Sequence, residues 1–137
     1  MSLGEWNPNA EAEANDYQLD FELLANYAAL MSDADSKDLT QSITNAEVTK
    51  HAALMLKDRL AWQRYVDQAE DQEVIQLIRF LTLAEEQLPG WEAGAESPVI
   101  KLNKLLRKRG VKLDRDLLVW IKANSTNQYL PNGAVLL

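Results

Sequence analysis

The fold of this 137-residue chain is decided by residues 71–88, which read DQEVIQLIRFLTLAEEQL. One set of apolar side chains in this stretch recurs at the spacing of a single helical face, and a second set fills the remaining sides. The first set is Val74, Leu77, Ile78, Leu81, Ala84 and Leu88, and the second is Ile75, Phe80 and Leu83. A helix that is apolar over most of its circumference belongs at the centre of a bundle, because every side needs a neighbour.

Helical spacing and capping signals extend outward from this centre in both directions. Thr44 and Glu47 match a capping box, Ser97-Pro98 and Asp114 mark two further helix starts, and Gly110 marks a stop. No stretch shows the alternation expected of a strand. The sequence therefore predicts an all-α fold, a compact bundle or array of five to six helices with an irregular C-terminal tail. The expected ranges are 16–31, a short piece at 36–43, 44–68, 71–88, 98–109 and 114–124.

The domain organisation follows from the same patterns. Residues 1–14 are polar, small and acidic, and we expect a flexible leader there, followed by a single helical domain at 15–137. The chain has no cysteine, which excludes disulfides and thiolate chemistry and fits a reducing compartment. No run of about 18 apolar residues and no signal peptide is visible, so we expect a cytoplasmic protein without membrane contact.

Charge is divided unevenly along the chain. Residues 1–96 carry 19 acidic and 6 basic residues, a net charge of −13, whereas residues 97–137 carry 2 acidic and 8 basic residues, a net charge of +6. The overall formal charge of −7 argues against a general binder of nucleic acid or anionic membranes. The divided charge is the most unusual feature of the composition.

The basic part is concentrated in residues 101–115, which hold seven of the chain's 14 cations and only one acidic residue, Asp114. Lys101, Lys104 and Lys108 share one outward face of the helix predicted at 98–109, and Arg109 lies at its end. Three interpretations stay open. The cations could neutralise acidic groups of the same fold, contact a protein or small anion, or bind nucleic acid through a helical hairpin at 98–115.

Two aromatic residues outside the predicted helices are further candidates for partner contact. Trp91 lies between Gly90 and Gly94 in a loop, and Tyr129 lies in the tail. Large aromatic side chains are enriched at the centres of protein interfaces, so either residue could anchor a partner. Trp91 could equally close the end of the bundle, and the same alternative applies to Tyr129.

Few residues suggest catalysis. His51 is the only histidine, and Glu47 lies one turn before it, so a metal-dependent enzyme using this pair is one hypothesis. Neighbouring acids such as Glu85 and Glu86 diverge on a helix and are expected on a solvated face. We therefore expect no catalytic residue, no metal site and no cofactor.

The sequence thus favours a protein–protein interaction or regulatory module that binds an unknown protein or itself. The candidate contact residues are Trp91, Lys101, Lys104, Lys108, Arg109 and Tyr129. Nucleic-acid binding through 98–115 is the first alternative, and the enzyme with Glu47 and His51 is the second.

Overall fold

A computed structural model of the chain describes residues 17–32 and 37–133. Within these ranges all regular structure is helical and no strand occurs, which confirms the predicted fold class. The α-helices are α2 (Phe21–Ala29), α3 (Asn45–His51), α4 (Arg59–Gln68), α5 (Asp71–Gln87), α6 (Pro98–Lys108) and α7 (Arg115–Asn124). Short 3-10 turns lie at Leu39–Gln41, Ala52–Leu56 and Gly94–Glu96. None of the described helices is long and apolar enough to cross a membrane.

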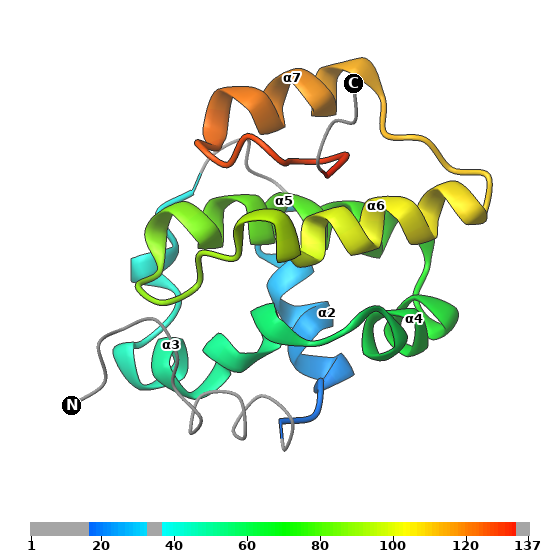
Figure 1. The fold of residues 1–137 in the computed structure, drawn as a ribbon. Coiled ribbons are helices and arrows are strands. Elements are labelled where there is room, and N and C mark those ends of the chain that lie inside the picture. Colours follow the sequence, from blue (N-terminus) through cyan, green and yellow to red (C-terminus); the bar gives the residue numbers. More distant parts are fainter. Residues whose placement is uncertain (1–16, 33–36, 134–137) are drawn as a thin grey trace.

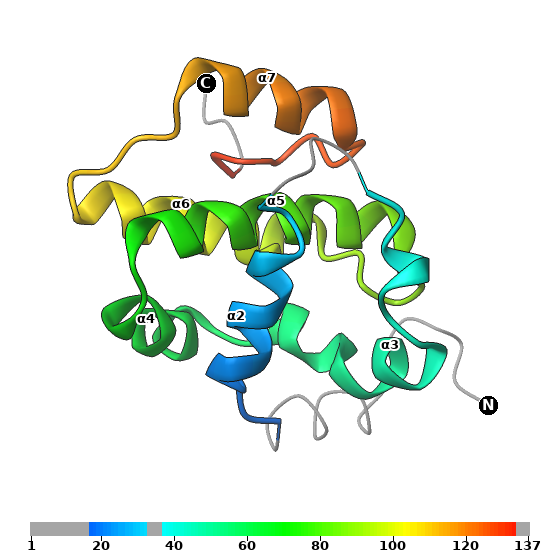
Figure 2. The ribbon, with the colours of Figure 1, turned by 180° about the vertical axis from the view of Figure 1, so that it is seen from behind.

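Helix α5 lies at the centre of the bundle, as its sequence predicts. It packs against α2, α6 and α7, and α6 in turn packs against α4 (Figure 1). The view from behind shows α2 crossing α5 on the side away from α6 (Figure 2). Nine residues of α5 are buried, from Val74 to Glu85, and they point to several sides of the helix. The apolar circumference therefore specifies the position of α5.

The prediction of a single long helix at 44–68 is wrong. The chain forms α3, then the 3-10 turn Ala52–Leu56, and α4 starts only after Lys57, whose backbone is extended. The Asp58 carboxylate accepts a hydrogen bond from the backbone N–H of Ala61 and so caps a new helix. The turn buries the consecutive residues Leu54 and Met55 and leaves Leu56 exposed. Helical spacing of the apolar residues continues through the break, so periodicity alone did not detect it.

The other boundaries agree more closely with expectation. Helix α2 begins after Asp20, which caps it, so the helix is shorter than the predicted 16–31. The short element predicted at 36–43 is a 3-10 turn capped by Asp38. The predicted start of α2 at residue 16 and the leader expected at 1–14 lie outside the described residues.

The C-terminal segment is irregular, as predicted, and it packs back onto the bundle. Residues 125–133 run between α7 and the α5–α6 pair (Figures 1 and 2). Leu130 is buried, and the side-chain amide of Asn103 on α6 donates a hydrogen bond to the Pro131 carbonyl at 3.1 Å. The buried Asn103 thus holds this segment against the middle of α6.

Two buried tyrosines provide a matched test of the core. The Tyr27 ring stacks on Phe80 with ring centroids 4.3 Å apart, but its buried hydroxyl has no hydrogen-bond partner among residues 17–32 and 37–133. The Tyr65 hydroxyl donates to the Glu73 carboxylate at 2.6 Å. We predict that Tyr27→Phe changes the free energy of unfolding by less than about 1 kcal/mol, because no hydrogen bond is lost.

Tyr65→Phe should lower the free energy of unfolding by about 2 kcal/mol, since it removes a bond to a charged acceptor. Urea denaturation of both variants measures the difference. Equal losses in the two variants would contradict this assignment of the polar contacts.

Candidate functional site

The outward face of α6 carries cations because its inward face is wholly occupied by the core. Its apolar residues, among them Val99, Leu102 and Leu106, are buried, and the exposed side chains between and after them are basic. Six cations between α6 and the first residue of α7 are exposed, and we define the basic surface as the five of them other than Arg109: Lys104, Arg107, Lys108, Lys112 and Arg115. In the parts of the chain that the structure describes, none of the five forms an ion pair. Arg107 makes one neutral contact, donating to the side-chain oxygen of Asn132 at 3.1 Å.

Two of the predicted contact residues have internal roles instead. The Lys101 ammonium donates to the Lys57 carbonyl at 2.8 Å, at the turn that precedes α4, and burial lowers the pKa of Lys101. The Arg109 guanidinium donates to the carbonyls of Val66 and Ala69 and pairs with Asp71 at 2.6 Å. Arg109 therefore joins the end of α6 to the α4–α5 junction. Arg109 thus pairs with an acidic group of the same fold, as the intramolecular interpretation expects, whereas Lys101 donates to a backbone carbonyl.

Trp91 is buried, which corrects its expected role as an exposed anchor for a partner. Its side chain is 0% exposed, and the indole N–H donates to the Val48 carbonyl at 2.9 Å. The ring packs edge-on against Tyr27 and Phe80. Trp91 thus closes the bundle between α3 and α5, which was the alternative that the sequence left open.

Tyr129 is half-buried and packs against the core. It borders a hollow near the end of α5, together with Glu86 and Glu92. Its backbone N–H donates to the Asn127 side chain at 3.0 Å, so a local turn fixes its position. None of the five cations of the basic surface lines this hollow.

The pair proposed for metal-dependent catalysis is engaged elsewhere. The Glu47 carboxylate accepts hydrogen bonds from the backbone and hydroxyl of Thr44, completing the predicted capping box. The His51 Nδ1 lies 2.7 Å from the Tyr17 hydroxyl. Burial, and then the nearby charge of Asp20, raise the pKa of Tyr17 to about 12. Among residues 17–32 and 37–133, no three His, Cys, Asp or Glu side chains are grouped as metal ligands.

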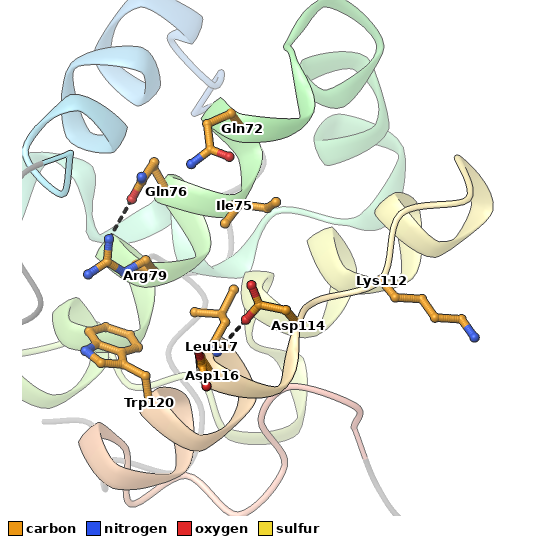
Figure 3. A pocket seen from close by; sticks show the side chains of 9 residues that line it. All are labelled: Gln72, Ile75, Gln76, Arg79, Lys112, Asp114, Asp116, Leu117 and Trp120. Atoms are coloured by element: carbon orange, nitrogen blue, oxygen red, sulfur yellow. Dashed lines mark hydrogen bonds between the residues drawn. The ribbon is translucent and has the colours of Figure 1, made fainter.

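A groove between α5 and α7 is the main feature that the sequence did not predict. Its volume is about 570 Å³, and its apolar floor is formed by Ile75, Leu117 and the Trp120 ring (Figure 3). The polar lining consists of Gln72, Gln76, Arg79, Lys112, Asp114 and Asp116. The groove exists because α7 is anchored by the buried Ile121, while Leu117 and Trp120 stay half-buried.

One wall of the groove is held rigidly. The Arg79 guanidinium lies 5.1 Å from the centre of the Trp120 ring, a cation–π contact. The same guanidinium donates to Gln76 Oε1 at 2.9 Å and to the Met31 carbonyl at 3.0 Å (Figure 3). These contacts fix the orientation of the Arg79 side chain and of the Trp120 ring. Trp120 is half-buried, and no local pattern in the sequence distinguishes a half-buried position from a buried one.

Glu85 is also corrected, because it is 5% exposed rather than solvated. Its carboxylate accepts hydrogen bonds from the Ser97 hydroxyl at 2.6 Å, the Ala93 N–H at 3.1 Å and the Asn127 amide at 3.1 Å. These donors come from three segments outside α5. The buried carboxylate therefore holds the loop after α5, the start of α6 and the C-terminal segment together, and it has a structural role.

The site as a whole consists of the basic surface and the groove beside it, which meet at Lys112. Such an arrangement can bind, through charge and through a partly apolar recess. Comparison with protein-family models, curated proteins and solved structures gives no match to this chain. The functional inference therefore depends on the geometry and charge of the described residues.

Arg109 and Lys108 are neighbours with different expected contributions to stability. Arg109→Met keeps the aliphatic stem but removes the donors to Val66 and Ala69, and we predict a loss of about 1–2 kcal/mol in unfolding free energy. The ion pair adds little to this loss, because the Asp71 side chain is 45% exposed. Lys108→Met should change stability by less than about 0.5 kcal/mol. Thermal or urea unfolding that ranks the two variants in the opposite order would refute the structural role of Arg109.

His51 should make stability depend on pH. Burial of the ring, and then the charge of Lys50, lower the pKa of His51 below its ordinary value near 6.5. The unfolded chain therefore binds the proton more readily, so the contribution of His51 is present above pH 6.5 and is lost as the pH falls below it. We predict a lower urea midpoint at pH 5.5 than at pH 7.5, and a smaller difference in His51→Gln. Identical pH profiles for the two proteins would show that this linkage is absent.

Proposed function

We propose that this domain is a protein-binding module, without catalysis, that uses its basic surface to bind a partner with an acidic surface. The observation that carries the proposal is the set of five exposed cations around the end of α6 for which the described fold supplies no acidic partner. Side chains needed for internal neutralisation would be paired as Arg109 is paired. Exposed cations that lie close together in the sequence and have no acidic partner among the described residues instead favour encounter with an anionic surface.

The position of α6 favours a protein over nucleic acid as that anionic partner. Helices that enter the major groove contact base edges with their N-terminal residues. The N-terminal residues of α6, from Ser97 to Ile100, are buried in the core. The start of α7 is exposed, but Asp114 and Asp116 there would repel phosphates. The net charge of −7 adds a general repulsion.

The test is co-purification from an extract of the native host, treated with nuclease so that nucleic acid cannot bridge. We predict that the wild-type chain retains a protein partner at about 50 mM salt and loses it at higher salt, because exposed charge pairs are screened. Lys104→Glu/Lys108→Glu should lose this partner. Lys50→Glu/Arg64→Glu, which makes the same charge change at exposed positions of α3 and α4, should keep it.

Circular dichroism confirms that both double variants fold. Retention of the same partner by the Lys104→Glu/Lys108→Glu variant would overturn the proposal. Loss of the partner on nuclease treatment of the extract would favour the nucleic-acid alternative.

A further inference from the structure

We infer that the groove between α5 and α7 receives one large apolar side chain of the same acidic partner. This inference rests on the proposed function, since it assigns a second contact to the partner of the basic surface. The recognised segment would then be acidic and carry a single leucine- or phenylalanine-like residue. Three features of the groove support the inference: its size and floor, its connection to the basic surface, and the charge of its rim.

The size and floor of the groove suit an apolar side chain. Its volume of about 570 Å³ falls within the range of about 300–1,000 Å³ that is usual for ligand sites. Ile75 and Leu117 are half-buried, so part of their apolar surface stays in contact with solvent. Covering that surface releases water and stabilises the complex. Because Arg79 holds the Trp120 ring through the contact at 5.1 Å, little ordering of this wall is required on binding.

The groove is continuous with the basic surface through Lys112. Lys112 is one of the residues that line the groove, and its side chain extends outward, away from the other lining side chains (Figure 3). A segment that lies along α6 and pairs with Lys108 and Lys112 is thereby led to the mouth of the groove.

The rim of the groove orients the partner. Asp114 and Asp116 lie at the α7 side, and Asp114 is already occupied as the cap that accepts from the Leu117 N–H at 2.8 Å. Both carboxylates repel acidic residues, so the acidic part of the segment must lie on the α6 side of Lys112. The residue that lies between the two aspartates and Arg79 is therefore not acidic, and the Arg79 guanidinium repels a basic residue there. Charge and shape together assign this position to an apolar side chain.

The experiment uses two synthetic peptides of equal length and charge, each with six glutamates and one variable position that is phenylalanine or alanine. Fluorescence anisotropy at about 50 mM salt measures binding to the full chain, and the Trp120 indole resonance reports on the groove. We predict that the phenylalanine peptide binds about tenfold more tightly than the alanine peptide. Only the phenylalanine peptide should shift the Trp120 resonance.

Three variants locate the contact. Leu117→Gln removes apolar floor, and Gln72→Trp fills the groove from an exposed rim position where packing is not disturbed, so both should reduce the tenfold preference to about one. Val119→Gln changes the outer face of α7, where the side chain is 58% exposed, and should keep the preference. Gln72→Trp keeps the test valid if Leu117→Gln fails to fold.

The outcomes separate this inference from the function on which it rests. Equal binding of the two peptides to the wild-type chain, with no shift of Trp120, would overturn the groove inference and leave the basic surface as the contact. Absence of binding by both peptides at low salt would overturn both. A preference for phenylalanine that survives in Gln72→Trp and Leu117→Gln would place the apolar contact elsewhere and refute the inference.

Discussion

The burial of α5 on several sides is the constraint on which the rest of the structure depends. A helix with Val74, Leu77, Phe80 and Leu83 on different faces loses its hydrophobic stabilisation unless each face is covered. Helices α2 and α6 and, less completely, α7 provide that cover. The groove arises where cover is incomplete, because α7 contributes the buried Ile121 but leaves Ile75 and Leu117 half-buried. The central core and the candidate site thus have one cause.

Polar side chains, of which Glu85 and Asn103 are buried, fix how the covering elements join. Glu85 gathers three donors at one end of the α5–α6 pair, and Arg109 supplies donors to the α4–α5 junction at the other. Between them, Asn103 ties the C-terminal segment to α6. A buried polar group is costly without partners, so the contacts of Glu85 and Asn103 favour one arrangement of the chain over its alternatives. Hydrophobic burial brings the helices together, and these groups specify how they meet.

The sequence predicts most of the fold because capping signals and periodicity act locally. Thr44, Ser97 and Asp114 cap helices where expected. The break before α4 was missed because Asp58, its cap, lies within a continuous apolar period. That break is decided by tertiary packing of Leu54 and Met55, which no local pattern encodes.

The candidate site was less predictable than the fold for a related reason. A run of basic residues in the sequence identifies the cations but does not show which of them make contacts within the fold. Lys101 and Arg109 belong to the same run as Lys104 and Lys108, yet they donate to backbone carbonyls of the turn before α4 and the α4–α5 junction. Those carbonyls become acceptors only when distant segments meet, so the distinction is tertiary. The cations without such internal contacts, rather than the basic run as a whole, define the surface available to a partner. Uneven charge in the sequence therefore supports a function only once the internal contacts are known.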